Sequence, residues 1–374
     1  MFGARGTGKS TLVNRNFLGD SCLLIDLLDP INEELYMREP GQLEAVVLGL
    51  PDSITHVVID EVQKLPKLLD VVHRLIESTN KKFILTGSSA RRLKYGGANL
   101  LAGRAFVYDL FPLSYFELKD RFDLNMALQY GLLPHLYDLS DDEERKLFLQ
   151  SYAHTYLKEE IWAEQFVRKL DPFRRFLEVS AQSNGKIINM HNIAIDVGVD
   201  DKTVKQYFSI LEDTLLGFFL EPFKHSFRKR LSLKPKFYFF DPGVTRSLSQ
   251  LLSVPLVSST MGYGDAFEHF IILEFIKLNR YFNLDYKYSY LRTKDDSEID
   301  LVVERPGKKL LLVEIKSSVN VRENDLRKFI AISSELPDAE SICLSRDMKL
   351  KKYKHVTVYP WVDGLHHCFS EHLG

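Results

Sequence analysis

The stretch Gly3-Ala4-Arg5-Gly6-Thr7-Gly8-Lys9-Ser10 decides the fold of the N-terminal part of the chain, because it matches the pattern G-x-x-x-x-G-K-[ST] in full. The glycines let the loop curl so that backbone N–H groups face a phosphate, Lys9 reaches the β- and γ-phosphates, and the Ser10 hydroxyl ligates Mg²⁺. Thr11 opens a stretch that can form a helix, whose N-terminal dipole also favours the phosphate. A glycine-rich turn without a ligand is the alternative. We expect ATP and Mg²⁺ to be bound by Gly3, Ala4, Arg5, Gly6, Thr7, Gly8, Lys9, Ser10 and Thr11.

Two later apolar runs provide the other half of such a site. The run His56–Ile59 is followed by Asp60 and Glu61, where Asp60 would hold Mg²⁺ through water and Glu61 would polarise the attacking water. The run Lys82–Leu85 is followed by Thr86-Gly87-Ser88-Ser89, and a polar side chain such as Thr86 can lie near the γ-phosphate there. An Asp-Glu pair after a strand is often just a solvated loop, but here it lies between a phosphate loop and a Thr-Gly-Ser strand end. The pattern therefore predicts an ATP-hydrolysing site with Lys9, Glu61 and Thr86 as catalytic residues.

The beginning of the chain departs from the usual pattern. A phosphate loop normally follows a buried central strand, but only Met1 and Phe2 precede Gly3. Either the strand is missing because the chain starts late, or the fold tolerates a short stub. Since a missing central strand removes hydrogen bonds on both of its sides, we expect a misassigned start or a weakened nucleotide domain.

Arginines that follow the third apolar run are candidates for contact with a phosphate. Arg91, Arg92 and Arg104 could each act as an arginine finger within this subunit or towards a neighbouring one. For Arg91 and Arg92 the alternative is a solvent-facing surface position. The planar guanidinium of Arg104 suits either a phosphate or a carboxylate, and we include it among the candidate catalytic residues.

Composition narrows the class of protein. The 374 residues include 49 Lys and Arg against 51 Asp and Glu, a net charge of −2, with 45% hydrophobic and 27% charged residues. This excludes a wholly disordered or collagen-like chain, suggests two or three domains, and argues against a uniformly basic coat for nucleic acid. No apolar run approaches the roughly 18 residues of a membrane span, so no membrane partner is expected. The three cysteines are far apart and nothing resembles a signal peptide, so we expect a cytoplasmic protein.

The middle of the chain has the outline of a winged helix-turn-helix. Predicted helices at Phe173–Gln182, His191–Val197 and Asp201–Asp213, with a turn at Gly198, precede a strand at Gly217–Pro222. Polar side chains at the head of the last helix would face DNA, and basic residues follow the strand. These are Lys202, Lys205 and Gln206, then Lys224, Arg228, Lys229, Arg230, Lys234 and Lys236. They could contact DNA phosphates, or the segment could pack against protein with a solvated basic loop.

The last third of the chain carries a second set of candidate site residues. Glu268 lies on a predicted helix, whereas Asp300 and Glu314 lie on adjacent predicted strands, and the three carboxylates together can bind a divalent ion. Because side chains alternate along a strand, Glu314 and Lys316 share one face, where Lys316 can orient or activate water for attack on a phosphodiester. The alternative is a structural ion pair between Glu314 and Lys316 at a sheet edge.

Several motifs together resemble a known family. Beside the phosphate loop, the matching stretches are Val58-Ile59-Asp60-Glu61-Val62-Gln63, Leu85–Ser89, Leu101-Ala102-Gly103-Arg104, Phe111-Pro112-Leu113-Ser114, Tyr238–Gly243 and Glu298–Lys316. They resemble the AAA-superfamily ATPases of bacteria and archaea that carry a C-terminal DUF4143 region. The resemblance implies an ATPase module, a winged helix and a restriction-endonuclease-like domain similar to PD-(D/E)xK nucleases. It assigns nucleotide binding to residues 3–10, Mg²⁺ and water to Asp60 and Glu61, and a nuclease-like site to Glu268, Asp300, Glu314 and Lys316.

We therefore predict an α/β chain with four parts. These are a P-loop parallel-sheet ATPase core at 1–120, a helical lid or linker at 121–172, a winged helix-turn-helix at 173–240 and a PD-(D/E)xK-like α/β domain at 255–374. The leading hypothesis is an AAA-type ATPase whose nucleotide state controls a C-terminal half that engages DNA. The alternatives are a metal-dependent DNA nuclease regulated by ATP and a nucleotide-driven protein-interaction switch, with a second copy or another protein as partner.

Overall fold

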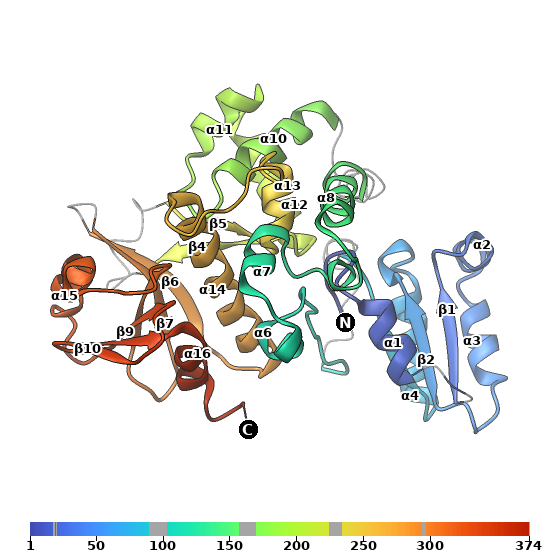
Figure 1. The fold of residues 1–374 in the computed structure, drawn as a ribbon. Coiled ribbons are helices and arrows are strands. Elements are labelled where there is room, and N and C mark those ends of the chain that lie inside the picture. Colours follow the sequence, from blue (N-terminus) through green and yellow to red (C-terminus); the bar gives the residue numbers. More distant parts are fainter. Residues whose placement is uncertain are drawn as a thin grey trace. The chain divides into compact units, whose positions relative to one another are not determined.

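The computed structural model describes most of the chain, namely residues 1–17, 19, 21–89, 103–156, 170–223, 234–293 and 297–373. The chain forms two compact units of mixed α/β structure (Figure 1). The first unit consists of Met1–Pro112, Leu133–His135 and Ser209–Leu216. The second consists of Leu113–Leu132, Leu136–Phe208 and Gly217–Gly374.

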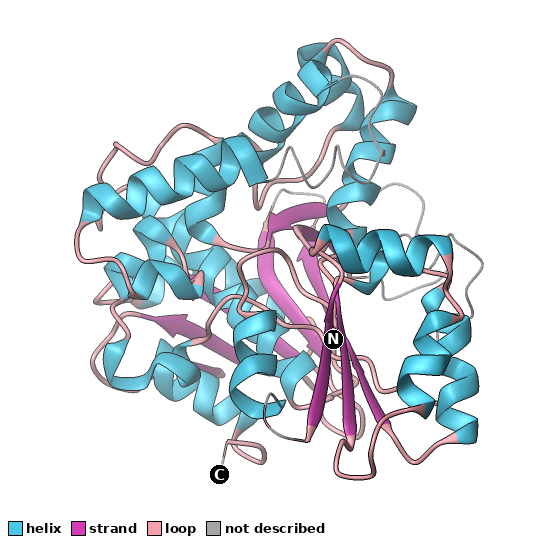
Figure 2. Ribbon diagram, turned by 90° about the vertical axis from the view of Figure 1, so that its right-hand side faces the viewer, coloured by secondary structure: helices cyan, strands magenta, loops and turns pink. Residues whose placement is uncertain are grey.

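A parallel sheet forms the centre of the first unit, as the alternation of apolar runs and helical patterns predicted. Its strands are β1 (Cys22–Asp26), β2 (His56–Asp60) and β3 (Lys82–Leu85), with β2 in the middle. They lie side by side in Figure 2. The helices of this unit are α1 (Lys9–Phe17), α2 (Pro30–Arg38), α3 (Gln42–Leu48), α4 (Leu68–Ser78) and the 3₁₀ turn Val62–Lys64. Because strands of a parallel sheet share one carboxyl edge, Asp60 and Thr86 come out beside the phosphate loop.

The two residues before the phosphate loop add a bridge to this sheet. Phe2 forms parallel bridges with Gly87 and with Asp109. The Phe2 amide donates to the carbonyl of Tyr108 at 2.8 Å, and the Phe2 carbonyl accepts from the amide of Leu110 at 2.6 Å. On the other side, the Gly87 amide donates to the Met1 carbonyl at 3.1 Å. Hydrogen bonds on both sides thus hold the short stub at the entrance of the loop, although it is too short to count as a strand.

The second unit contains an eight-stranded mixed sheet with the strand order β10-β11-β9-β8-β7-β6-β4-β5. Its strands are β4 (Gly217–Pro222), β5 (Lys236–Phe239), β6 (Lys287–Arg292), β7 (Glu298–Glu304), β8 (Leu311–Lys316), β9 (Glu340–Ser345), β10 (Lys351–Tyr353) and β11 (Val356–Pro360). The hairpin β4–β5 is antiparallel, and β4 also pairs with β6, so this hairpin belongs to the same sheet as the C-terminal strands.

Helices precede, interrupt and follow this sheet along the chain. They are α6 (Tyr115–Leu118), α7 (Leu124–Tyr130), α8 (Asp142–Ser151), α10 (Leu170–Gln182), α11 (Met190–Val197), α12 (Asp201–Asp213), α13 (Pro242–Leu248), α14 (Met261–Tyr281), α15 (Arg327–Ser333) and α16 (Trp361–Phe369). Short turns of other helix types occur at Lys119–Arg121, Pro134–Tyr137, Tyr152–Tyr156 and Glu323–Leu326. Among the described residues, no helix combines the length and apolar character needed to cross a membrane.

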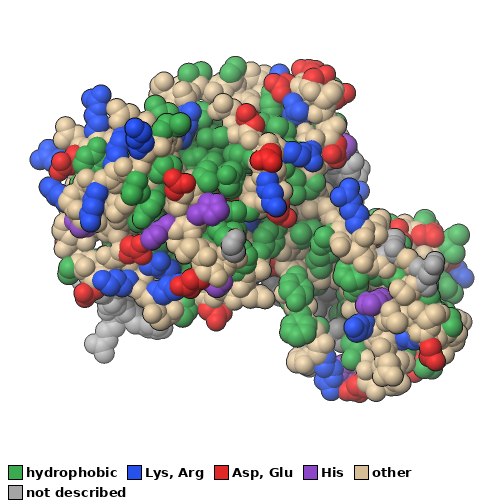
Figure 3. Space-filling view, turned by 60° about the horizontal axis from the view of Figure 1, so that its bottom comes forward, with side chains coloured by type: hydrophobic (Ala, Val, Ile, Leu, Met, Phe, Trp, Pro, Cys, Tyr) green, Lys and Arg blue, Asp and Glu red, His purple; other side chains and the backbone are tan. Residues whose placement is uncertain are grey.

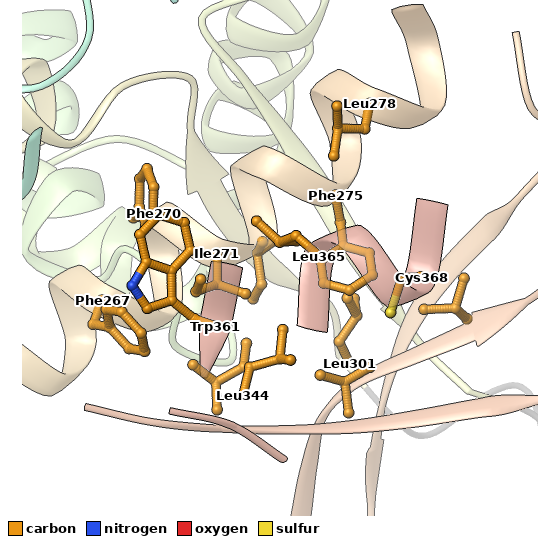
Figure 4. Close-up of a cluster of buried hydrophobic side chains, with 14 of the residues drawn as sticks. Phe267, Phe270, Ile271, Phe275, Leu278, Leu301, Leu344, Trp361, Leu365 and Cys368 are labelled. Atoms are coloured by element: carbon orange, nitrogen blue, oxygen red, sulfur yellow. The ribbon is translucent and has the colours of Figure 1, made fainter. Parts of the chain in front are cut away.

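The core of the second unit forms where α14 packs against the sheet and α16. Phe267, Phe270 and Phe275 on α14 are fully buried and face Trp361 and Leu365 of α16 (Figure 4). Their spacing of three to five residues places them on one side of the helix, as expected for an amphipathic helix that covers a sheet. This packing fixes α14, and with it the position of the helix-borne carboxylate Glu268.

A buried ion pair joins α14 to the segment before α6. Glu274 and Lys277 have no exposed side-chain surface, and the Lys277 Nζ lies 2.9 Å from a Glu274 carboxylate oxygen. The other Glu274 oxygen accepts from the Tyr115 amide at 2.9 Å, and Lys277 donates to the Leu113 carbonyl at 2.8 Å. Both charges therefore have a partner of opposite sign and a backbone partner, which a buried pair needs.

Candidate functional site

The phosphate loop adopts a backbone shape that only glycine allows at low strain. Gly6 and Gly8 have φ angles of 78° and 95°. A Cβ on Gly3 would lie 2.4 Å from the Leu110 carbonyl oxygen, so this position also requires glycine. The Thr7 hydroxyl donates to the Ala4 carbonyl at 2.8 Å and closes the curl. Of the other predicted loop residues, Arg5, Ser10 and Thr11 are exposed, as a surface that meets a ligand requires.

Side chains from the loop and from β2 converge. The Lys9 side chain is 5% exposed, and its Nζ donates to the carbonyls of Gly3 at 2.7 Å and Ala4 at 3.1 Å. The Ser10 hydroxyl donates to Asp60 Oδ2 at 2.9 Å. Helix α1 begins at Lys9, so its first N–H groups and its positive dipole end lie at the loop.

The strand ends place the remaining predicted residues next to Asp60. The Thr86 hydroxyl donates to Asp60 Oδ1, which also accepts from the Glu61 amide at 3.1 Å. Glu61 has a left-handed backbone, with φ 59°, at the turn that leaves β2. The structure thus brings together Lys9, Ser10, Asp60 and Thr86, and places Glu61 beside them.

Two further residues of this site received no role from the sequence. The Gln63 amide donates to the Glu61 carboxylate and to Ser88 Oγ at 3.0 Å, and Ser88 donates to the same Glu61 oxygen at 3.3 Å. The Gln63 side-chain oxygen is buried without a hydrogen-bond partner. Both residues occur within motifs quoted above, but only the fold shows that they hold the Glu61 carboxylate.

The chemistry of these groups fits a nucleotide with Mg²⁺. An ammonium group and the N–H groups at the start of α1 offer positive charge and donors to phosphate oxygens. A hydroxyl and a carboxylate offer hard oxygen ligands to the metal. Arg104, by contrast, pairs with Glu77 of α4 at 2.6 Å, so here its guanidinium holds a carboxylate. Arg91 and Arg92 lie outside the described residues.

The second set of candidate residues gathers on β7 and β8. Asp300 Oδ2 accepts from the Ile315 amide at 2.7 Å, and the Lys316 Nζ lies 2.6 Å from Glu314 Oε1. Glu314 is 6% exposed, and within the described parts of the chain its second oxygen, Oε2, is buried without a hydrogen-bond partner. Glu314 and Lys316 do form an ion pair, but they are neighbours on one face of the same strand.

Burial and mutual repulsion act on these carboxyl groups. Burial raises the pKa of Asp300 well above its usual range, and the charges of Glu314 and Glu268 raise it further. Burial also raises the pKa of Glu314, although Lys316 opposes this effect. Burial lowers the pKa of Lys316, but Glu314 and Asp300 outweigh it and the net shift is upward. Burial and the proximity of Glu314 thus both disfavour ionisation of Asp300.

Glu268, the third predicted ligand, has protein partners of its own. It accepts from the Tyr238 hydroxyl at 2.7 Å and lies 3.4 Å from the Nζ of Lys236, which also pairs with Glu298. Our expectation that Lys236 is a solvent-facing cation that contacts DNA phosphates is wrong, because its side chain is 5% exposed and points into this cluster. The sequence missed Lys236, Tyr238 and Glu298 as members of the cluster. Tyr238 and Glu298 occur within motifs quoted above, but no pattern in those motifs assigns either residue to a site.

Nowhere in the described parts of the chain do three or more His, Cys, Asp and Glu side chains group so as to hold a metal ion. The Asp300–Glu314 pair, with its unpartnered oxygen, nevertheless fits a hard cation. Mg²⁺ keeps several waters and often binds through one or two carboxylates. The residues present thus suit a two-carboxylate site better than the predicted three-carboxylate site.

The segment from α10 to β4 has the predicted order of three helices followed by a strand, and the structure adds that this strand pairs with β5 in a hairpin. Gly198 ends α11 in a left-handed conformation with φ 76°, and α12 follows at Asp201. The side chains of Lys202, Lys205 and Gln206 are exposed, as is Lys234. Lys224, Arg228, Lys229 and Arg230 lie outside the described residues. On the face drawn in Figure 3, basic and acidic side chains are interspersed.

Known protein families match both the N-terminal and the C-terminal part of the chain. Residues 1–119 match a model described as AAA domain, and residues 263–363 match the domain of unknown function DUF4143. The chain carries an AAA domain and a DUF4143 domain. Between them, residues 121–254 match a further domain of unknown function, DUF8612. The resemblance to AAA-superfamily proteins with a DUF4143 region is thereby confirmed.

The curated relatives of this AAA–DUF4143 chain are uncharacterized proteins. One from Mycobacterium tuberculosis is 25% identical over 311 residues, which cover 82% of this chain and 67% of that protein. One from Haemophilus influenzae is 21% identical and covers 86% of this chain and 84% of its own length. One from Methanocaldococcus jannaschii is 21% identical, with 88% and 77% covered.

Two solved structures are distant matches. The Aeropyrum pernix ORC1 protein in complex with DNA has a TM-score of 0.26 and 13% identity, and the match covers 67% of this chain and 85% of that chain. Can2 from Sulfobacillus thermosulfidooxidans in complex with cyclic tetra-adenylate has a TM-score of 0.23 and 11% identity, with 89% and 96% covered. Scores this low carry no argument about this chain.

Proposed function

We propose that the protein is an ATPase whose nucleotide state controls a C-terminal half that engages DNA. The observation that carries the first part is the convergence of the loop and β2, where Ser10 donates to Asp60 at 2.9 Å and the buried Lys9 lies in the same loop. These groups meet at the carboxyl edge of a parallel sheet, the edge at which ligands bind in such folds.

Each residue then has a defined part in phosphoryl transfer. Lys9 and the N–H groups at the start of α1 neutralise phosphate charge, while Ser10 and Asp60 provide oxygen ligands. Bound Mg²⁺ supplies additional positive charge to the phosphate oxygens. Glu61 orients the attacking water, and Gln63 and Ser88 fix the position of its carboxylate.

Nucleotide binding is tested by fluorescence titration with a labelled ATP analogue. Substitution Lys9→Ala removes a charge-assisted contact, so we expect the dissociation constant to rise about tenfold or more, equivalent to about 1.4 kcal/mol. The exposed Lys67 lies in the same domain, and Lys67→Ala serves as the matched control. Unchanged binding by Lys9→Ala would contradict the proposed site.

DNA engagement is supported by the helix order and by the exposed Lys202 and Lys205 on α12. Each phosphate contact contributes about 0.9 to the slope of log binding constant against log salt concentration. We expect Lys202→Ala with Lys205→Ala to reduce this slope by about 2, and ATP to change the affinity of the wild-type protein. The pair Lys287→Ala and Lys309→Ala removes the same charge elsewhere. Absent or salt-independent DNA binding would instead favour a protein-interaction switch.

A metal-dependent DNA nuclease regulated by ATP is the second candidate function. It is favoured by the buried, unpartnered Oε2 of Glu314 beside Asp300 and Lys316. With a divalent cation on the two carboxylates, Lys316 would orient water towards a phosphodiester. We expect plasmid nicking with Mg²⁺ or Mn²⁺ that is lost in Asp300→Ala and in Lys316→Ala but kept in Lys309→Ala. Intact plasmid across metals and nucleotide states would rule out cleavage by this cluster.

A further inference from the structure

The carboxylate cluster of the second unit has two halves. One half contains Asp300, Glu314 and Lys316, where Glu314 Oε2 has no hydrogen-bond partner among the described residues. The other contains Glu268 of α14 and Glu298 of β7, with the Nζ of Lys236 in ion-pair contact with both. The two halves adjoin, because Glu298 and Asp300 are two residues apart on β7 and therefore share one face of that strand.

Lys236 is held in place from several sides. It lies on β5, which pairs with β4, and its Nζ is 5.5 Å from the centre of the Tyr290 ring. The Tyr290 hydroxyl in turn donates to the Lys234 carbonyl, two residues before Lys236. Its side chain is 5% exposed and its Nζ is in ion-pair contact with Glu268 and Glu298. The ammonium group of Lys236 is therefore fixed between two carboxylates of the cluster.

Carboxylates outnumber ammonium groups in the cluster. The carboxylates are Glu268, Glu298, Asp300 and Glu314, and the ammonium groups are Lys236 and Lys316. Sites with two metal ions bind both at carboxylates that are shared or adjacent. Here one pair of carboxylates already has a cation of the protein's own between its members, and the unpartnered oxygen belongs to the other pair.

We propose that Lys236 is a resident cation that takes the place of a second metal ion, so that the cluster binds a single divalent cation at Asp300 and Glu314. The proposal rests on the metal-dependent candidate function, because it assumes that this cluster binds metal. It adds that Lys236 sets the number of ions. In this role Lys236 is a positioning residue, since it holds Glu268 and Glu298 and contacts no substrate.

The stoichiometry of Mn²⁺ binding to the full chain without nucleotide tests the proposal, measured by the loss of the free-ion signal in electron paramagnetic resonance. The wild type should bind one Mn²⁺ per chain, and Glu314→Gln should abolish this binding. Lys236→Gln should bind two, and adding Glu268→Gln should return the number to one. Lys287→Gln, an exposed lysine on β6, is the matched control and should keep the number at one.

The outcomes separate a failure of the proposed role of Lys236 from a failure of the metal-dependent candidate function. If the wild type binds none, both the metal-dependent function and the role of Lys236 fail. If the wild type binds two, or if Lys236→Gln still binds one, only the role of Lys236 fails. Should Lys236→Gln be unfolded without metal, Mn²⁺ must restore its far-ultraviolet circular dichroism, because the ion would replace the lost ammonium. A variant that Mn²⁺ cannot restore overturns the proposal.

Discussion

Substitution Lys277→Met leaves the Glu274 carboxylate buried without its cation. Neither side chain has exposed surface, and of its partners among the described residues Glu274 would keep the Tyr115 amide alone. Removing one member of a buried ion pair typically costs about 3–5 kcal/mol, because the remaining charge stays desolvated. With a urea dependence of about 3 kcal/mol per molar, the unfolding midpoint of the second unit should fall by about 1–2 M.

Tryptophan fluorescence during urea unfolding measures this midpoint, because Trp361 is buried in the core of the second unit. A double variant, Glu274→Gln with Lys277→Met, removes both charges and keeps an acceptor for the Tyr115 amide. It should be more stable than Lys277→Met alone by about 1–2 kcal/mol. Exposed Lys287→Met should shift the midpoint very little. An unchanged midpoint for Lys277→Met, or a double variant less stable than the single one, would refute the reasoning.

Three other substitutions or reactions test the second unit. Gly243→Ala places a Cβ 1.7 Å from the Tyr130 carbonyl oxygen, so it should destabilise the unit by about 3 kcal/mol in urea unfolding. Gly262→Ala should leave the stability unchanged, because no described atom lies within 4 Å of the added Cβ. Burial raises the pKa of the Cys368 thiol to about 12, so iodoacetamide at pH 8 should label Cys22 before Cys368 in the folded protein, as mass spectrometry would show; equal labelling would contradict this. Burial raises the pKa of Asp347, but the hydrogen bonds that its carboxylate makes with Lys351, Val321 and Ser345 lower this pKa overall. The stability that Asp347 contributes is therefore present above its unfolded-state pKa and is lost as the pH falls through its folded-state pKa. Urea midpoints measured from pH 6 to pH 3 should therefore fall less steeply in Asp347→Asn, and parallel curves would argue against this role.

The nucleotide site could be predicted from sequence because its chemistry is local. Lys9 and Ser10 lie in one loop, and Asp60 and Thr86 directly follow apolar runs, so a parallel sheet necessarily brings them to one edge. The same reasoning could not assign Gln63, because a glutamine two residues after Glu61 carries no pattern of its own. Its role depends on the left-handed turn at Glu61, which is a property of the folded backbone.

Only part of the carboxylate cluster could be predicted from the sequence. Strand periodicity places Glu314 and Lys316 on one face, but Lys236 reaches Glu268 across 32 residues of sequence. In a stretch rich in lysine and arginine, Lys236 looks like one more surface cation. Its burial follows from the pairing of β4 with both β5 and β6, a long-range arrangement that local patterns do not encode.

The bridges of Phe2 couple the start of the phosphate loop to two neighbouring segments of the first unit. One residue bonds the carbonyl of Tyr108 through its N–H and the amide of Leu110 through its carbonyl, and the neighbouring Gly3 amide donates to Gly87 at 3.2 Å. Displacing the start of the phosphate loop therefore breaks hydrogen bonds to both flanking segments at once. The amide hydrogens of Phe2, Gly3 and Leu110 should exchange with solvent at one common opening free energy, which makes them a native reporter of loop movement.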